Sequence, residues 1–224
     1  MADAASRRTS LREQLEELAA SVNRPEDAKA AINRAFADIE EQGLVPGLAI
    51  GDRAPDFELP DARGGRVRLA DRLATGPVVL TFYRGSWCPY CNLELRAYQS
   101  RLDEFAAQDA SLIAVSPQAP DDAMSMSEKN ALEYDVLSDV DQHVLDAYRI
   151  RFDLPAGITA HMLDSTLAAL AKQQPDGHYS LPVPATFVLD RQGTVRARHV
   201  SMAYRTRMEP DEALAAIREI NAAR

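Results

Sequence analysis

Two cysteines three positions apart, Cys88 and Cys91, are the residues whose type and spacing could do chemistry. They lie in Trp87-Cys88-Pro89-Tyr90-Cys91, between an apolar run that predicts a strand and a segment that predicts a helix. A cysteine in the first turn of a helix meets unpaired backbone N–H groups and the positive end of the helix dipole, and both favour the thiolate. Thiolates attack disulfides and peroxides, and a second sulfur can close a disulfide with the first. With Pro89 stiffening the turn, the pattern predicts a redox-active dithiol.

Two other roles fit a cysteine pair less well. A zinc site needs four ligands, but the chain has no second cysteine pair. Its four histidines, His143, His161, His178 and His199, are scattered without ligand spacing and are expected at the surface or in the core. A structural disulfide between such close residues would add little stability, because the loop that it closes is short. We therefore expect neither a metal nor a cofactor.

Composition narrows the class of protein. The chain has 224 residues, of which 46% are hydrophobic, and a formal net charge of −9. That length fits one domain with an appendage, and the acidic balance argues against a nucleic-acid partner. No run approaches the roughly 20 apolar residues that cross a membrane, and the first residues lack the apolar segment of a signal peptide. We expect a cytoplasmic protein without a membrane partner, and there a close cysteine pair is more often catalytic than structural.

Residues 1–45 predict an arm of two amphipathic helices. The first begins with Ser10-x-x-Glu13, the pattern of a capping box; the second has Pro25 in its first turn and stops at Gly43. Their apolar faces are Leu11, Leu15, Leu18 and Val22, then Ala28, Ile32, Phe36 and Ile39. Such faces need an apolar surface, so the arm is expected to dock on its own domain or on a second copy in a homodimer. A helical pair that only packs explains the pattern equally well.

Residues 46–224 alternate strand and helix patterns and form the second predicted domain. Strands are predicted at 78–83, 111–115, 136–137, 186–189 and 194–200, the last two as a hairpin. Helices are predicted from about 90 to 105, over 121–132, over 140–148 with Asp139 as cap, and from Pro210. Residues 151–180 could be a lid over the cysteines or a plain insertion, with a helix near 162–170 and a turn at 175–177. The order predicts an α/β fold with a mixed sheet and helices on both faces.

Residues 51 to about 220 resemble the alkyl hydroperoxide reductase / thiol-specific antioxidant branch of the peroxiredoxin superfamily. The resemblance is closer to its peroxiredoxin-like members that carry Cys-x-x-Cys. The matching segments are Gly-Asp-Arg-Ala-Pro-Asp-Phe at 51–57, Phe-Tyr-Arg-Gly-Ser-Trp-Cys-Pro-Tyr-Cys at 82–91, Val-Ser-Pro-Gln at 115–118 and Pro-Ala-Thr-Phe-Val-Leu-Asp at 184–190. The resemblance implies a thioredoxin-like fold and a thiol-dependent antioxidant activity.

The active-site residues depart from the pattern of that family. In its Pro-x-x-x-Thr/Ser-x-x-Cys motif the last cysteine attacks peroxide, and that position falls on Cys91. The threonine position is Cys88, the proline position is Arg84, and the family's later catalytic arginine falls on Pro184. Val183-Pro184 instead resembles the cis-proline loop of thioredoxins, and Cys-Pro-Tyr-Cys is the tetrapeptide of glutaredoxins. We therefore expect a cis peptide bond at Pro184, beside the cysteines.

Three neighbouring residues are expected to support the dithiol or to lie near it. Arg84 and Arg96 could each stabilise a thiolate, although an arginine is more often a solvated surface charge. Trp87 is expected to pack beside the sulfurs, since an indole does no acid–base work.

Three functions stay open. In the first, Cys91 attacks a hydroperoxide and becomes a sulfenic acid, Cys88 resolves it as a disulfide, and a thioredoxin- or glutathione-type donor reduces that disulfide. In the second, a thiol–disulfide oxidoreductase, Cys88 attacks a disulfide substrate and Cys91 resolves; Pro184 and the missing peroxide-polarising residues favour it. In the third, the dithiol is a sensor whose oxidation changes how the amphipathic segment at 10–42 docks.

Overall fold

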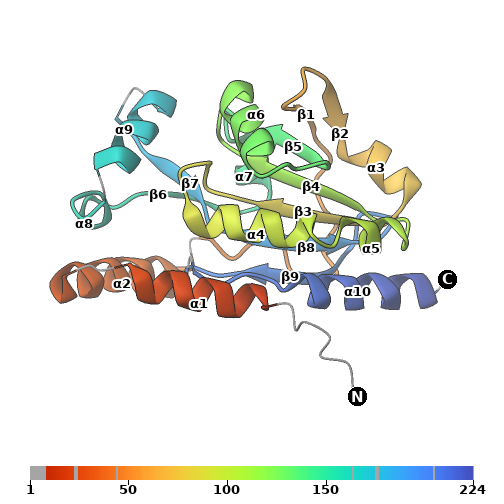
Figure 1. Cartoon of the computed structure of the whole chain (residues 1–224), viewed down its shortest axis with the longest axis horizontal. Coiled ribbons are helices and arrows are strands. Elements are labelled where there is room, and N and C mark those ends of the chain that lie inside the picture. The colour runs from red at the N-terminus through yellow and green to blue at the C-terminus, as the bar shows by residue number, and fades with distance from the viewer. Residues whose placement is uncertain are drawn as a thin grey trace, which may run out of the picture.

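The protein is described by a computed structural model that covers residues 9–22, 25–43, 45–162, 164–174, 177–203 and 205–223 (Figure 1). Within these residues the helices are α1 Leu11–Ser21, α2 Glu26–Glu41, α3 Leu69–Thr75, α4 Pro89–Gln99, α5 Leu102–Ala106, α6 Pro120–Lys129, α7 His143–Ala147, α8 Ala156–Thr159, α9 Asp164–Gln173 and α10 Pro210–Ala222. The strands are β1 Glu58–Pro60, β2 Arg66–Arg68, β3 Val78–Phe82, β4 Ser111–Ser116, β5 Asp135–Ser138, β6 Arg151–Asp153, β7 Ser180–Pro182, β8 Ala185–Leu189 and β9 Val195–Val200.

A five-stranded mixed sheet in the order β5-β4-β3-β8-β9 forms the centre. β3, β4 and β5 run parallel, whereas β8 pairs antiparallel with β3 and with β9. β3 is the central strand, and all five of its residues are buried because both faces of the sheet are covered. The predicted fold class, a mixed sheet between helices, is confirmed.

Alternate residues of the strands serve two separate cores. Val79 faces the core that α4, α5 and α10 build with Leu95, Phe105 and Leu214. Leu80 faces the opposite core, which α3 and α7 close with Leu69, Val144 and Leu145. The active-site strand is therefore fixed from both sides.

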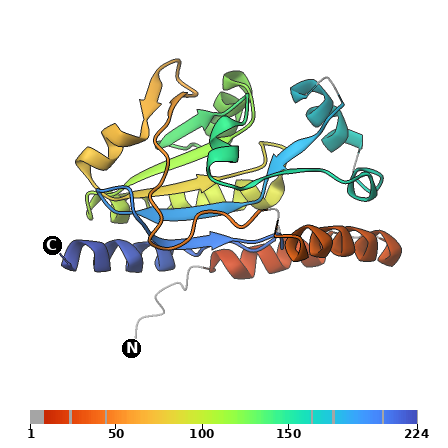
Figure 2. The same ribbon diagram turned by 180° about the vertical axis from the view of Figure 1, so that it is seen from behind.

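The N-terminal helices pack on the same chain. α1 begins with the predicted capping box, in which Glu13 N donates to Ser10 Oγ at 3.1 Å and Ser10 N donates to Glu13 Oε2 at 2.8 Å. Leu11 and Leu15 are buried in the core that contains α4. α1, α2 and α10 lie along one side of the sheet in both views (Figures 1 and 2). Docking on its own domain is the arrangement that the structure has, whereas the homodimer and the domain boundary at residue 45 stay predictions.

Residues 151–182 form a small unit at the end of the molecule where α2 lies (Figure 1). β6 and β7 pair antiparallel, and α8 and α9 follow β6. Ile32 and Phe36 of α2 share a buried apolar cluster with Phe152, Ile158 and Leu170 of this unit. α2 and the segment 151–182 therefore share one buried apolar cluster.

Several boundaries differ from the predictions. The predicted helix from about 90 to 105 is two helices, because α4 ends at Gln99 and α5 begins at Leu102; the apolar spacing continues across the break. Pro25 is the cap that precedes α2 rather than part of its first turn. The helix after Asp139 begins only at His143, and Val140 is 53% exposed, although the Asp139 carboxylate does accept the N–H groups of Val144 and Leu145.

Several other elements were not predicted from the sequence or lie at shifted positions. β1, β2 and α3 precede the first predicted strand, and the helix predicted near 162–170 is α9, displaced toward the C-terminus. The turn expected at 175–177 lies partly outside the described residues. None of the helices in the described ranges combines the length and the apolar character that a membrane crossing requires.

Candidate active site

The two cysteines lie where β3 passes into α4. Cys88 is the residue that caps α4, Pro89 is its first residue, and Cys91 is in its first turn. The chain reaches this point through a tight turn in which Cys88 N donates to Gly85 O at 3.0 Å. Asn92 holds the turn from inside the helix, because its Nδ2 donates to Cys88 O at 2.8 Å and to Ser86 O at 2.9 Å.

Gly85 is needed because two features of this turn exclude a side chain. Its φ is +149°, a conformation that favours glycine, and a Cβ there would lie 2.5 Å from Trp87 Nε1. The Trp87 ring in turn lies 5.0 Å from the Arg84 guanidinium, a cation–π contact. The turn therefore fixes an aromatic ring and a positive charge next to Cys88.

The surroundings of the two sulfurs shift their pKa values in opposite directions. The pKa of Cys88 is lowered to about 6, first because the thiol of Cys91 donates a hydrogen bond to it and further because Arg84 and Arg207 are positive; burial works against them. Burial raises the pKa of Cys91 well above its ordinary value, and its hydrogen bond to Cys88 acts in the same sense. Of the two thiols, Cys88 is therefore the one whose surroundings favour the thiolate.

A buried ion pair that the sequence did not reveal supports this arrangement. Arg207 Nη2 donates to Cys91 Sγ at 3.5 Å, and Arg207 Nε donates to Glu94 Oε2 at 2.5 Å. Both side chains are at most 1% exposed. Thr81 and Thr186 donate from their hydroxyls to Glu94 Oε1 at 3.1 and 3.3 Å. Burial raises the pKa of Glu94 to about 7, and Arg207 opposes that rise.

Only one member of this pair left a trace in the sequence. Glu94 follows Cys91 by three residues and breaks the apolar inner face of α4 between Cys91 and Leu95. A charged residue on a buried helix face signals a partner elsewhere. Arg207 lies in the connection before α10, where no pattern distinguishes it from other arginines.

Cys88 lines a cavity of about 470 Å³ and Cys91 does not. The floor of the cavity is Arg84, Trp87, Cys88, Pro89 and Tyr90. The other lining residues, which we call the roof, are seven from the arm and from the segment after β6: Val22, Ile32, Phe36, Ile158, Met162, Ser165 and Thr166. Cys88 is 2% exposed and Cys91 is 0% exposed, so a small molecule would reach Cys88 through this cavity.

The other predicted site residues are placed as follows. Arg84 lies beside the dithiol and lowers the pKa of Cys88. Arg96 is not among the charges that act on Cys88, and its Nη1 donates to Asn130 Oδ1 at 3.1 Å. Pro184 is buried where β7 passes into β8, and the register of β3 and β8 sets it at the Cys end of β3.

The predicted cis bond at Pro184 is wrong. Every peptide bond of the described residues is trans. Val183 N donates to Ile150 O at 2.7 Å and Ala185 pairs with Phe82, so the chain runs from β7 into β8 along an extended path.

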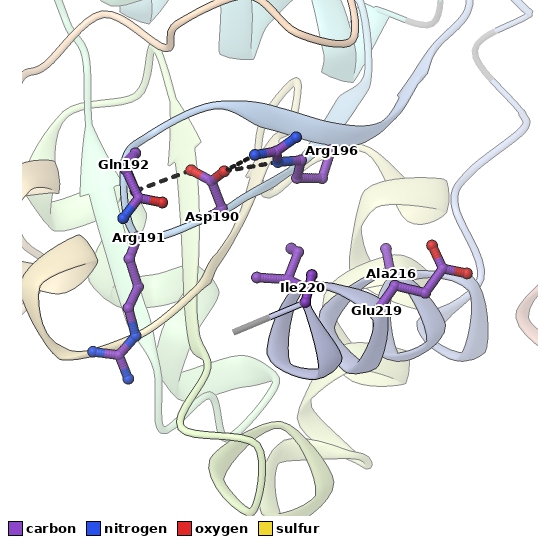
Figure 3. A pocket seen from close by; sticks show the side chains of 8 residues that line it. Asp190, Arg191, Gln192, Arg196, Ala216, Glu219 and Ile220 are labelled. Atoms are coloured by element: carbon purple, nitrogen blue, oxygen red, sulfur yellow. Dashed lines mark hydrogen bonds and ion pairs between the residues drawn. The ribbon is translucent and has the colours of Figure 1, made fainter.

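A second cavity, of about 640 Å³, lies between the β8–β9 turn and α10, far from the cysteines in the chain fold (Figure 3). Asp190, Arg196 and Glu219 line it, and Asp190 already accepts hydrogen bonds from Arg196 Nε and from Gln192 N. Neither cysteine takes part.

One group of three side chains in the described ranges offers oxygen and nitrogen atoms close enough together for a metal. It is Asp139, Asp141 and His143, which excludes both cysteines. The Asp139 carboxylate there already holds the N-terminus of α7, and the other two side chains are exposed and bonded to each other. The dithiol site is thus built from sulfur, arginine and glutamate groups of the chain itself.

Comparisons with known proteins give a consistent picture. The model of the AhpC/TSA family matches residues 50–198. A putative peroxiredoxin of Mycobacterium tuberculosis is 33% identical over 101 residues, which are 45% of this chain and 64% of that protein. Peroxiredoxin Bcp of Escherichia coli is 29% identical over 103 residues, 46% of this chain and 65% of that protein. The chain thus spans somewhat less than two thirds of the length of these curated relatives.

Solved structures agree with the fold. The crystal structure of peroxidoxin BcpB from Mycobacterium tuberculosis is similar with a TM-score of 0.60 and 28% identity, covering 77% of this chain and 98% of that one. The reduced 2-Cys peroxiredoxin of Plasmodium vivax gives a TM-score of 0.59 at 18% identity over 79% of this chain and 98% of that one, a likeness of fold alone. The predicted thioredoxin-like fold is confirmed.

The matched range runs from the loop before β1 into β9 and includes both cysteines, whereas Arg207 and the arm lie outside it. The family expected from the sequence is confirmed: this chain belongs to the AhpC/TSA family.

Proposed function

We propose that the protein is a thiol-dependent peroxidase whose Cys88–Cys91 dithiol reduces a hydroperoxide and becomes a disulfide. The observation that carries this proposal is the position of the pair. Cys88 caps the N-terminus of α4 and lines a cavity, and the hydrogen bond from Cys91 together with Arg84 lowers its pKa. The membership of the chain in the AhpC/TSA family and its peroxiredoxin relatives support the same chemistry.

The reaction balances with two thiols and one hydroperoxide. The Cys88 thiolate attacks the outer oxygen of ROOH, the O–O bond breaks, and RO⁻ takes a proton to leave as ROH. Cys88 is then a sulfenic acid. Cys91 loses its proton and attacks the Cys88 sulfur, hydroxide leaves and takes that proton as water, and the disulfide forms. Two electrons pass from the sulfurs to the peroxide.

The family motif and the geometry of the site favour different sulfurs as the one that attacks the peroxide. On the family motif the attacking position falls on Cys91. Cys91 is fully buried, lines no part of the cavity and has a raised pKa, whereas Cys88 lines the cavity and has a lowered pKa. We therefore propose Cys88 as the attacking sulfur and Cys91 as the resolving one.

Arg84 and Arg207 supply the positive charge for this chemistry. Both lower the pKa of Cys88, and Arg207 contacts the Cys91 sulfur, which must become a thiolate in the resolving step. Preorganised charges of this kind stabilise developing negative charge without reorganisation. Arg207 would thus supply the positive charge of the family's later arginine, whose position is Pro184 in this chain.

A second function, thiol–disulfide exchange, draws on the same Cys88 thiolate at a helix N-terminus. Thiol–disulfide exchange differs from peroxide reduction in its oxidant, which would be a disulfide and would have to reach Cys88. Either reaction ends in the same disulfide and needs a thiol of the thioredoxin or glutathione type as reductant.

The test is a stopped-flow measurement of Trp87 fluorescence, since Trp87 is the single tryptophan of the chain. Reduced protein is mixed with hydrogen peroxide, with cumene hydroperoxide, or with an oxidised peptide disulfide. We expect peroxide oxidation at least about 10²-fold faster than that of a free thiolate, the size of effect that one well-placed electrostatic group gives. Oxidation by peroxide no faster than a free thiolate, together with rapid exchange with the disulfide, would replace the proposed function by the second.

A further inference from the structure

The roof over Cys88 restricts what can touch the dithiol. It faces the sulfur from two directions, with Val22, Ile32 and Phe36 from the arm and Ile158 and Met162 from the segment after β6. Phe36 also packs edge-on against Phe152, with ring centroids 6.2 Å apart, so the two parts of the roof are joined. The space between roof and sulfur, about 470 Å³, is within the range of cavities that hold one small organic molecule.

The arm is fastened to the domain at several points away from the cavity. Leu11 and Leu15 are 2% and 3% exposed in the core beneath α4. The Glu209 carboxylate accepts the N–H groups of Arg12 at 2.6 Å and of Leu11 at 3.2 Å, which ties the start of α1 to the start of α10. These contacts hold α1, and α2, which carries Ile32 and Phe36, is held by the buried apolar cluster that it shares with Phe152 and Leu181.

A protein reductant needs a different surface. Its cysteine must come within bonding approach of the disulfide sulfur, about 3–3.5 Å, while its face covers roughly 800 Å² of the partner. In the structure both cysteines are free thiols, with Cys88 2% exposed and Cys91 0%, so neither sulfur meets that requirement in this arrangement of the roof. A small thiol meets it by entering the cavity.

We propose that the Cys88–Cys91 disulfide is reduced by a low-molecular-weight thiol that enters the roofed cavity, and that the roof excludes thioredoxin-type proteins. One thiol, as thiolate, attacks Cys88 Sγ, the disulfide bond breaks, and Cys91 leaves as a thiolate beside Arg207 and takes up a proton. A second thiol attacks the sulfur of the first in the mixed disulfide and releases the Cys88 thiolate. Two RSH become RSSR, and two electrons pass to the protein.

This inference rests on the proposed function only in taking the disulfide as the oxidised state. The test therefore starts from disulfide formed with diamide, without peroxide. The oxidised protein is mixed with dithiothreitol, with glutathione, or with a thioredoxin kept reduced by its reductase, and the return of two free thiols is followed by quenched alkylation and mass spectrometry. We expect reduction by the small thiols and, at equal thiol concentration, thioredoxin slower by about tenfold or more.

Two pairs of variants separate the roof from the rest of the arm. Ile32→Asp places a carboxylate in the roof, whereas Ala30→Asp places one on the exposed side of the same helix. We expect Ile32→Asp to raise the thioredoxin rate about tenfold or more and Ala30→Asp to leave it unchanged. Ser165→Phe narrows the cavity that Ser165 lines, and Ala168→Phe is its exposed control on α9. Ser165→Phe should slow the small thiols, and it keeps the test available if Ile32→Asp fails to fold.

Rapid reduction of the wild-type disulfide by thioredoxin, or equal small-thiol rates in Ser165→Phe and Ala168→Phe, would overturn the inference. If peroxide fails to oxidise the protein but the diamide-formed disulfide shows the expected order of reductants, the inference stands and only the peroxidase proposal fails.

Discussion

Glu94 and Arg207 form a buried ion pair, and neutralising one partner should cost a different amount of stability from neutralising the other. The pKa of Glu94 is raised to about 7 from 4.5, so this carboxyl can shed its charge inside the protein near neutral pH. The guanidinium cannot, because an arginine keeps its proton in proteins. Glu94→Gln therefore leaves the buried Arg207 charge without the carboxylate that its Nε contacts, and Arg207→Met leaves a carboxyl that becomes protonated.

The magnitudes follow from this difference. Removing one partner of a buried ion pair so that a charge stays behind costs about 3–5 kcal/mol, the loss expected for Glu94→Gln. Protonating Glu94 in Arg207→Met adds less than about 1 kcal/mol at pH 7, since the pKa already lies there. The double variant, with neither charge, should be more stable than Glu94→Gln alone, by at least about 1 kcal/mol.

The pH dependence has a definite sign. Between 4.5 and about 7 the folded protein holds a proton on Glu94 that the unfolded chain has released. The contribution of this group to the free energy of unfolding therefore falls as the pH rises through that window, by roughly 3 kcal/mol, and is constant above it. Glu94→Gln should remove that fall.

Urea unfolding of the wild type, both single variants and the double variant at pH 5 and pH 7.5 checks these values. The reasoning is refuted if Arg207→Met at pH 7.5 costs as much as Glu94→Gln, or if the double variant is the least stable of the four. Arg207→Met should also lower the reactivity of Cys88 near neutral pH. The pKa of Cys88 should rise without Arg207, whose charge lowers it.

Three further predictions concern the sulfur, the turn and the arm. Alkylation of Cys88 by iodoacetamide in Cys91→Ala, followed by mass spectrometry, should show a pKa between the wild-type value of about 6 and an ordinary thiol value, because the hydrogen bond from Cys91 is lost while Arg84 stays; an unchanged pH profile would contradict the assigned cause. Gly85→Ala should lower stability by about 1–3 kcal/mol and shift the Trp87 emission, since the added Cβ meets the indole; a wild-type spectrum and melting curve would contradict this. Leu15→Ala should cost about 2–5 kcal/mol in urea unfolding, whereas Glu16→Ala, exposed on the same helix, should stay within about 0.5 kcal/mol; equal losses would show that the arm is not docked as described.

Much of the fold was predictable because its signals are local. The buried strand at 78–82, the hairpin of β8 and β9 and the capping box at Ser10 are all set by residues close in sequence. The break between α4 and α5 was not predictable, because the apolar spacing continues across it. Arg101, which lies at the break, forms ion pairs with Glu104 and Asp211 that the spacing does not indicate.

The residues of the site differ in the same way: those close together in sequence were predictable, and those that only the fold brings together were not. Cys88, Pro89 and Cys91 were found from their spacing, and Arg84 and Trp87 from their nearness to them. Arg207 is 116 residues from Cys91, and only the folded sheet brings the segment before α10 against α4. The roof had no signal either, since packing of α2 on the segment after β6 depends on tertiary structure.

The central claim, that Cys88 is the sulfur that attacks peroxide, is tested most directly by trapping the sulfenic acid. One equivalent of hydrogen peroxide is added to reduced Cys91→Ser and to reduced Cys88→Ser at pH 7 in the presence of dimedone, and each protein is read by intact and peptide mass spectrometry over time. We predict rapid formation of a dimedone adduct on Cys88 in Cys91→Ser and no rapid adduct in Cys88→Ser. A rapid adduct on Cys91 in Cys88→Ser, with Cys91→Ser unreactive, would contradict the account and restore the order that the family motif implies.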